Sequence, residues 1–232
     1  MKENTKREPV ERTEARQTAL LSRMRDIGED GEWVTHLGEQ FIVFRNVLPP
    51  WDDSKPLIEQ LEVPPQGKVL DVGTGTGIIA IFAAYKGAAQ VVATDINPDA
   101  LRNAQYNVLF HGFAATIEVR HSDVFSNLAA DEQFDVITAN LPFRKKDSID
   151  YATAAMWDTG FATTRRFLTG AKAHLRPGGR IYMAQSSFGE LEELHLIATN
   201  AGLTVRPVGE RIMPHEPDRI YYAFELTPTA NS

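Results

Sequence analysis

Val69-Leu-Asp-Val-Gly-Thr-Gly-Thr-Gly77 joins an apolar strand to a turn in which every second residue is glycine. Glycine adopts backbone angles that other residues avoid, and its bare main chain lets a ligand come close. A strand, a glycine-rich turn and a helix also begin the nicotinamide-dinucleotide fold, but that fingerprint needs a glycine where this chain has Ile78. The stretch therefore predicts an α/β protein with a ligand-binding turn and disfavours a dinucleotide. A tight turn without a ligand is the alternative.

The second informative segment is an apolar run that begins at Val91 and ends in Asp95. An acid at the end of the second strand can accept hydrogen bonds from both hydroxyls of a ribose. The same acid could cap the next helix, but Asn97 followed by Pro98 is the better cap and first turn. We therefore expect Asp95 to be free for a ligand.

The third segment, Phe134-Asp-Val-Ile-Thr-Ala-Asn-Leu-Pro-Phe143, is a strand that ends in an asparagine and opens a proline-aromatic loop. The side-chain oxygen of Asn140 and the carbonyl of Leu141 can together accept both protons of an NH2 group. Phe143 can stack on a planar amide, guanidinium or base. The segment therefore favours a planar nitrogen as the reacting group, with an ordinary loop after a strand as the alternative.

In this order the three segments resemble the class I S-adenosylmethionine-dependent methyltransferases. A fourth stretch, Phe41-Ile-Val-Phe-Arg-Asn-Val-Leu-Pro-Pro-Trp51, is followed by Asp52-Asp53-Ser54 and a helix from about Pro56. It resembles the segment before the core in the release-factor glutamine methyltransferases and the small-domain RNA guanine methyltransferases, where an apolar hairpin lids the cofactor. The resemblance covers roughly residues 38–226.

The acceptor loop departs from the Asn-Pro-Pro-Tyr form of the enzymes that it resembles. Leu141 replaces the first proline and Phe143 replaces the tyrosine. Asn-Leu-Pro-aromatic variants occur in the rRNA adenine dimethyltransferases. The departure therefore weakens the inference about the substrate more than the inference about nitrogen.

The resemblance implies S-adenosyl-L-methionine as cofactor. It also implies methyl transfer to a planar nitrogen (an amide, guanidine or exocyclic base amine) of a protein, metabolite or nucleic acid. The residues that it implies around the cofactor are Asp71, Gly73, Thr74, Gly75, Gly77, Asp95, Ile96, Asp123, Val124 and Asn140. The catalytic residues that it implies are Asn140, Leu141, Pro142 and Phe143. Asp123 is expected to accept a hydrogen bond from the adenine amino group, with a simple turn as its alternative role.

Two other functions fit the same residues. One is a methyltransferase that acts on oxygen or carbon of a small metabolite, with Phe143 only as a pocket wall. The other is a non-catalytic S-adenosylmethionine-binding subunit or sensor. The Asn-x-Pro-aromatic loop argues against the second, because a protein that only binds the cofactor needs no clamp for an acceptor.

The net charge of −7 disfavours a protein that holds long nucleic acid through its own phosphate contacts. Arg144-Lys145-Lys146 is a local basic run directly after the acceptor loop, and a solvated loop is its alternative role. We therefore favour a protein or a small molecule as acceptor and keep RNA open.

The rest of the composition limits the cellular compartment and the kinds of chemistry that we expect. There are no cysteines for disulfide or thiolate chemistry, the six histidines lack metal-ligand spacing, and we expect no metal. The charged N-terminus lacks an apolar signal core, and no run has the length of a membrane span. A cytoplasmic enzyme without a membrane partner is the expectation.

We expect an N-terminal extension over residues 1–50, on the lid and substrate side, and a catalytic domain over 51–232. Residues 1–8 are expected to be disordered, 9–27 to form an amphipathic helix, and 32–37 with 40–47 to form a hairpin. The expected core strands are 68–72, 90–94, 116–120, 134–139, 180–185, 203–208 and 219–226. The other expected helices are 77–86, 98–110, 153–175 and 188–200.

Strands that alternate with helices predict an α/β fold with a doubly wound, mostly parallel, seven-stranded Rossmann-like sheet. Its last strand should be antiparallel, since only a loop over 209–218 precedes it. Ligands of such sheets bind at the carboxyl ends of the strands. Gly73, Asp95, Asp123 and Asn140 all fall at such ends or just after them, which predicts a single site.

Overall fold

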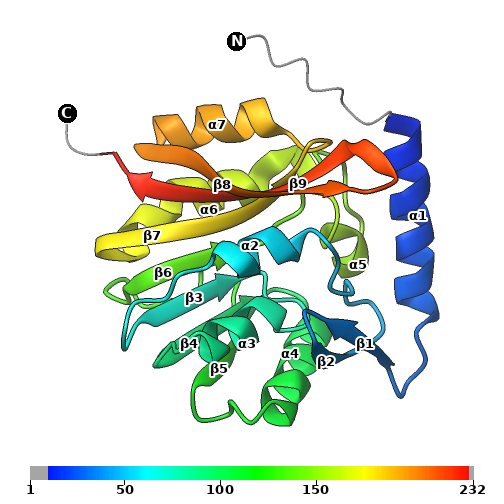
Figure 1. The fold of residues 1–232 in the computed structure, drawn as a ribbon, viewed down its shortest axis with the longest axis horizontal. Helices are drawn as coiled ribbons and strands as arrows, with labels where there is room; N and C mark the ends of the chain where they lie inside the picture. The colour runs from blue at the N-terminus through cyan, green and yellow to red at the C-terminus, as the bar shows by residue number, and fades with distance from the viewer. Residues whose placement is uncertain (1–9, 230–232) are drawn as a thin grey trace.

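The large sheet has seven strands in the order β5-β4-β3-β6-β7-β9-β8 (Figure 1). The computed structural model describes residues 10–229. The strands are β3 (Lys68–Val72), β4 (Gln90–Asp95), β5 (Ile117–His121), β6 (Phe134–Ala139), β7 (Leu175–Ser186), β8 (Leu203–Met213) and β9 (Glu216–Pro228). Neighbours pair in parallel except at β9, which is antiparallel to both β7 and β8. The predicted fold class, with an antiparallel last strand, is confirmed.

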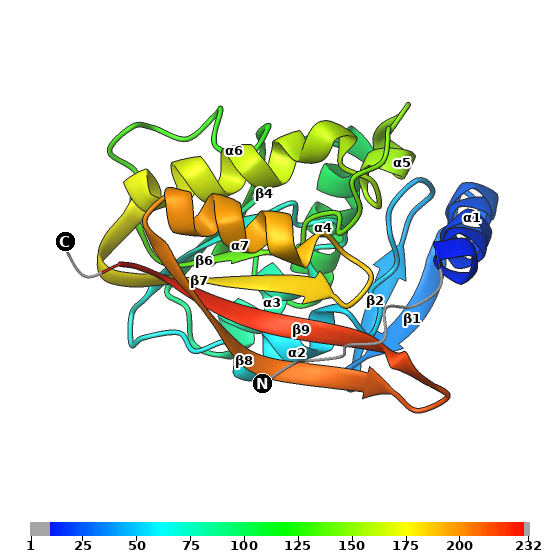
Figure 2. The same cartoon turned by 90° about the horizontal axis from the view of Figure 1, so that it is seen from above.

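Helices cover both faces of this sheet, as the view from above shows (Figure 2). They are α2 (Ser54–Gln60), α3 (Ile78–Tyr85), α4 (Pro98–Phe110), α6 (Ala162–Gly170) and α7 (Leu191–Asn200). Successive side chains of a strand point to opposite faces. Accordingly Leu70 packs in the cluster with α6 and α7, whereas its neighbour Val69 packs in the cluster with α2, α3 and α4.

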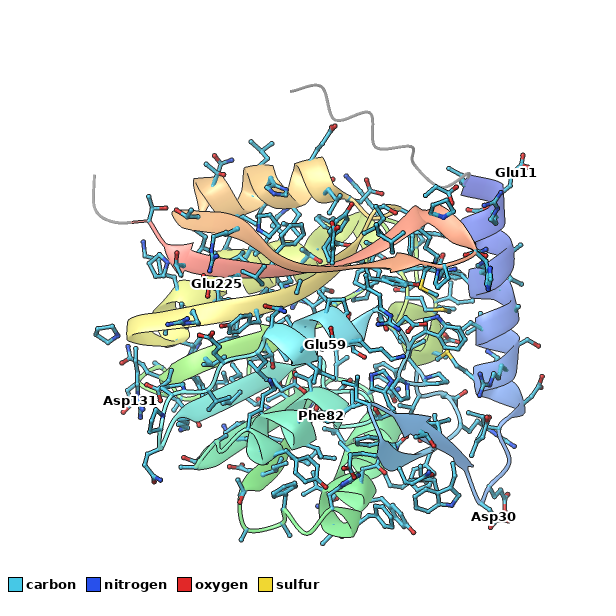
Figure 3. All side chains as sticks on the ribbon, viewed as in Figure 1. Glu11, Asp30, Glu59, Phe82, Asp131 and Glu225 are labelled. Carbon is cyan, nitrogen blue, oxygen red and sulfur yellow. The ribbon has the colours of Figure 1, made fainter. Side chains whose placement is uncertain are left out.

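The N-terminal extension consists of α1 (Val10–Asp26) and a separate hairpin of β1 (Glu32–His36) and β2 (Glu39–Val43). Figure 3 labels Glu11 near the start of α1 and Asp30 in the turn that leads to β1. Two buried asparagines of α4 hold the hairpin, because the Ile42 N–H donates to Asn107 at 3.0 Å and the Phe44 N–H donates to Asn103 at 2.8 Å. The predicted helix and hairpin are confirmed, although β2 ends four residues before the expected position.

The expected helix over 153–175 is wrong as a single element. The segment divides into α5 (Tyr151–Ala154), a 3-10 turn at Thr159–Phe161, α6, and a second 3-10 turn at Ala171–His174. Asp158 causes the restart, since its carboxylate accepts from the N–H groups of Thr163 at 2.9 Å and Thr164 at 2.8 Å. Gly160 and Phe161 interrupt the helical backbone there with φ of 63° and 57°.

The expected loop over 209–218 is also wrong, because β8 continues to Met213 and β9 already begins at Glu216. A tight turn at Pro214 and His215 joins them, so the strands form a long hairpin. Pro214 lies in this turn and Pro217 is the second residue of β9, so neither proline interrupts most of the ladder.

Among the described residues, no helix is long and apolar enough to cross a membrane. Within the same range, no group of three or more His, Asp or Glu side chains is arranged to hold a metal ion. The prediction of disorder for residues 1–8 lies outside the described residues.

Candidate active site

Two cavities meet at the carboxyl edge of the sheet. The first, the glycine-loop cavity, has a volume of ≈ 680 Å³ and lies against the turn after β3 and the end of β4. The second, the hairpin cavity, has a volume of ≈ 510 Å³ and lies between α1, the β8–β9 turn and the loop after β6. Both cavities are lined by Leu48, Asp53, Asn140, Leu141, Pro142 and Ala155, so these six residues form the wall between them.

The glycine turn lines the first cavity with bare main chain. Gly73 and Gly75 have φ of 72° and 55°, in the left-handed region that favours glycine. The N–H groups of Gly73 and Thr74 donate to the Thr94 carbonyl at 2.9 and 2.8 Å, which ties the turn to β4. A Cβ on Gly75 would meet no atom within 4 Å, so this part of the turn is open to a ligand.

Two residues predicted to bind the cofactor lie behind the turn and outside the lining of both cavities. A Cβ on Gly77 would meet the Ala104 Cα at 3.1 Å, so this glycine serves close packing of the turn on α4. The buried Asp71 accepts from the hydroxyls of Thr74 and Thr138, each at 2.7 Å. Burial raises the pKa of Asp71 from 3.8 to about 6, although both hydrogen bonds lower it. Asp71 therefore supports the turn from beneath.

Asp95 lines the first cavity, but it is not free as expected. One carboxylate oxygen accepts from the Gly75 N–H and the other from the Asn97 N–H, each at 2.9 Å. Burial raises the pKa of Asp95, and these N–H groups lower it. Each carboxylate oxygen can accept a further hydrogen bond. Asn97 is the helix cap as predicted, since its oxygen accepts from the Asp99 N–H at 2.9 Å.

Ile96 and Val124, predicted to lie around the cofactor, and Asp123, the predicted adenine acceptor, also line the first cavity. Ile96 is 39% exposed, and the buried Val124 adopts a φ of 55°. Asp123 makes a two-pronged ion pair with Arg166 of α6, at 2.6 and 2.8 Å. Both Asp123 oxygens are thus already in use, a contact that the sequence did not indicate.

Asn140 lies in the wall between the cavities. Its Nδ2 donates to Asp53 Oδ2 at 2.9 Å, and within residues 10–229 its side chain makes no other hydrogen bond. Leu141 and Pro142 share this position, whereas Phe143 lines only the hairpin cavity. The structure therefore brings all four predicted catalytic residues to the second cavity.

Sequence reasoning missed Asp53. This residue stands at the N-terminus of α2, where an acid usually caps the helix, but its side chain makes no capping hydrogen bond. It is buried, and burial raises its pKa while the Asn140 hydrogen bond lowers it. Asp53 therefore fixes which atom of the Asn140 amide remains available. The paired acids Asp52-Asp53 next to Ser54 were the only signal.

The walls of the hairpin cavity were also missed, because they come from distant segments. The rings of Phe143, Phe188 and Tyr221 lie 6.0 to 6.4 Å from one another. Arg219 lies over two of them, 5.3 Å from the ring centres of Phe188 and Tyr221. Helix α1 completes the wall with Arg16, Gln17, Ala19, Leu20 and Arg23.

Residues 52–202 match the family described as the methyltransferase small domain. The chain is 36% identical over 169 residues to a release factor glutamine methyltransferase of Cereibacter sphaeroides. The aligned region covers 68% of this chain and 59% of the relative. It is 34% identical over 156 residues to a putative protein N5-glutamine methyltransferase of Methanocaldococcus jannaschii, over 64% of this chain and 77% of the relative.

A solved 16S rRNA methyltransferase of T. thermophilus, RsmC in complex with AdoMet and guanosine, has the same fold. Its TM-score is 0.63 at 21% identity, over 86% of this chain and 50% of the other. The chain thus belongs to the methyltransferase small domain family, within the class I S-adenosylmethionine-dependent methyltransferases. It spans 59% and 62% of the lengths of two release factor methyltransferases that it matches.

S-adenosylmethionine suits the residues of the glycine-loop cavity. The open main chain at Gly75 admits a close ligand, and Asp95 retains lone pairs for hydroxyl donors. Ile96 and Val124 offer apolar surface for a base.

Proposed function

We propose that this protein transfers the methyl group of S-adenosylmethionine to a planar nitrogen. The observation that carries the proposal is the position of Asn140 in the wall between two cavities, with its Nδ2 already engaged by Asp53. With Nδ2 engaged, Oδ1 is the atom of the Asn140 amide that remains available, and an amide oxygen can accept a hydrogen bond from an NH2 group.

The glycine-loop cavity would hold the methyl donor. Gly73, Thr74 and Gly75 would meet it with main chain, Asp95 would accept from its ribose hydroxyls, and Ile96 and Val124 would cover its base. S-adenosylmethionine, when bound, supplies an electrophilic methyl group that a nitrogen lone pair can take in an in-line displacement. Asp123 would reach the adenine amino group through the lone pairs that Arg166 leaves.

The hairpin cavity would hold the acceptor. Asn140 Oδ1 and the Leu141 carbonyl would accept both NH2 protons, which directs the nitrogen lone pair toward the other cavity. Such orientation can lower a barrier by up to about 7–11 kcal/mol. The two acceptors also localise a lone pair that is otherwise delocalised, a preorganised electrostatic contribution. Pro142 and Phe143 would fix the plane of the acceptor.

The N-terminal extension would act as a lid, and residues 51–232 as the catalytic domain. Helix α1 lines the hairpin cavity, and residues 47–50 line the glycine-loop cavity. Ion pairs hold α1 to the start of β9, between Arg16 and Glu216 and between Arg12 and Asp218. A protein or a small molecule is the favoured acceptor, RNA stays open, and the expected location is the cytoplasm.

The test is single-turnover methylation by Asn140→Ala, with donor affinity measured in parallel. The rate should fall by about a hundredfold or more, the scale of removing one preorganised group, while donor affinity stays nearly intact. Asn140→Asp is the matched variant and should keep part of the activity, because a carboxylate also accepts two hydrogen bonds. Equal rates for the wild type and Asn140→Ala would favour oxygen or carbon methylation, and donor binding without any transfer would favour a sensor.

A further inference from the structure

We infer that the acceptor is a small organic acid, with a planar NH2 group at one end, a flat apolar middle and a carboxylate at the other end. The inference rests on the proposed function and names its substrate class. It follows from contacts between the groups that line the hairpin cavity. Phe143, on the same loop as Asn140, contacts Phe188 and Tyr221, and Arg219 lies over these last two rings.

The flat middle follows from the rings that line the cavity. Phe143, Phe188 and Tyr221 form a mutually contacting set, and Met156 and Met213 add further apolar surface. A volume of ≈ 510 Å³ is within the range of small-molecule sites. A single glutamine side chain would leave most of this apolar space unfilled.

The carboxylate follows from Arg219. Its side chain is only 15% exposed, and its Nε donates to the Tyr221 hydroxyl at 2.8 Å. The carboxylate of Glu216 forms an ion pair with Arg219 at 3.7 Å, which is beyond hydrogen-bond distance, and it also pairs with Arg16. Within residues 10–229, no acceptor pairs with the Arg219 Nη2. A mostly buried guanidinium with donors to spare, stacked on rings, is suited to a planar carboxylate.

A macromolecular acceptor fits less well. Helix α1 lies across the cavity and is tied down on several sides, since Gln17 accepts from the Trp157 Nε1 at 2.9 Å and Arg25 pairs with Asp150 at 2.7 Å. The basic run beside the loop is already paired. Arg144 contacts Glu14 and Gln17, Lys145 contacts Glu193, and Lys146 contacts Glu14 and the Trp157 ring. Little unpaired positive charge in this run remains for a phosphate backbone.

The experiment is calorimetry on the full chain saturated with S-adenosylhomocysteine. The probes are 4-aminobenzoate and 4-carbamoylbenzoate, each compared with its decarboxylated partner, aniline or benzamide. A glutamine-containing decapeptide and a short RNA hairpin are titrated alongside. We expect at least one carboxylated probe to bind about tenfold or more tightly than its partner, because a charge-assisted pair with Arg219 is lost in the partner.

Arg219→Gln should abolish this ratio and leave the affinity for S-adenosylhomocysteine unchanged, and Arg219→Lys should give an intermediate ratio because the fork is lost but the charge is kept. The matched control is Arg206→Gln on the same hairpin. Arg206 pairs at 2.8 Å with Glu225, which Figure 3 shows on the half of β9 away from α1.

Equal affinity within both probe pairs, no binding of either carboxylated probe, or a ratio that survives Arg219→Gln would overturn the inference. Binding of the peptide or RNA alone would do the same. Calorimetry measures binding without methyl transfer, so the two proposals can fail separately. If only the proposed nitrogen methylation fails, a carboxylated probe still binds with the expected ratio, but Asn140→Ala methylates at the wild-type rate.

Discussion

The two cavities meet at Asn140, yet they are built in different ways. The glycine-loop cavity is centred on residues that follow β3, β4, β5 and β6, among them Gly73, Asp95, Asp123 and Asn140. The hairpin cavity depends on side chains from remote segments, and the Arg16–Glu216 pair in its wall joins residues 200 positions apart. The first cavity is thus a property of the fold, whereas the second is a property of this chain. Substitutions in the two cavities should therefore separate donor effects from acceptor effects.

The largest effect is expected for Asp95→Ala. The change removes two proposed ribose hydrogen bonds to a charged acceptor, each worth about 1.5–3 kcal/mol gross, so donor affinity should fall by about a hundredfold or more. The Gly75 and Asn97 N–H groups also lose their acceptor. Calorimetry with S-adenosylmethionine measures the loss, and thermal unfolding reports the structural part.

Asp99→Ala is the matched control, because Asp99 lies in the first turn of α4 outside both cavity linings. Undiminished donor affinity in Asp95→Ala would contradict the ribose assignment. A parallel loss of acceptor affinity would break the distinction between the two cavities.

Asp53→Ala should have the next largest effect, because Asp53 positions Asn140 and belongs to both cavities. Loss of one hydrogen bond lets the amide rotate, so the methylation rate should fall by about tenfold while donor affinity changes little. Asp53→Asn should recover part of the rate, since its oxygen can still accept from Nδ2. An unchanged methylation rate in Asp53→Ala would contradict the role of Asp53 in positioning Asn140.

The same carboxyl should produce a pH dependence. Burial raises the pKa of Asp53 above its ordinary value. Below that pKa the carboxyl is protonated and is a weaker acceptor for Asn140, so the wild-type rate should fall as the pH is lowered through it. Rate profiles against pH should show this limb in the wild type and lack it in Asp53→Asn.

The same division between neighbouring and distant residues decides how much of the fold and the site could be predicted from the sequence. The glycine turn, the Asn97 cap and the alternation of strands with helices were predicted because each depends on neighbouring residues. The break at Asp158 was not, because a continuous helical pattern does not reveal which acid will cap a new helix. Asp53 could not be assigned, because its partner Asn140 lies on a loop far away in the sequence. Arg219 could not be assigned, because Phe188, over which it lies, comes from the segment after β7.

A smaller effect is expected where α1 closes the hairpin cavity. Arg16→Gln removes the ion pair to Glu216, and a partly exposed pair of this kind contributes about 0.2–1 kcal/mol. The KM for the acceptor should therefore rise by about two- to fivefold, with donor affinity unchanged and a smaller difference at high salt. Steady-state kinetics at two salt concentrations measures it.

Glu118→Gln is the matched control for Arg16→Gln, because it removes a comparable ion pair with Arg120 on the far strand β5. A lid that only extends the core would leave the acceptor KM the same in both variants. A change in donor affinity instead would mean that α1 acts on the glycine-loop cavity.

The smallest effect concerns the seam between the hairpin β1–β2 and α2, where His36 Nε2 lies 3.2 Å from the Ser54 hydroxyl. Burial, with the nearby Lys55 and Arg211, lowers the pKa of His36 from 6.5 to about 4, against the opposing effect of Asp52. The unfolded chain therefore takes up this proton near pH 6.5 and the folded chain only near pH 4. The contribution of His36 to the free energy of unfolding is complete above pH 6.5 and is lost as the pH falls toward 4.

Solvent screening limits this contribution to about 1 kcal/mol. Asp71 acts in the opposite direction, since its raised pKa makes the folded state bind more protons between pH 6 and 4. The difference between the wild type and His36→Gln isolates the histidine. Urea unfolding from pH 7 to pH 5 should show a wild-type stability that declines relative to the variant. If the stability of the wild type and of His36→Gln changes with pH in the same way, the β1–β2 hairpin opens independently of the core and leaves His36 in water.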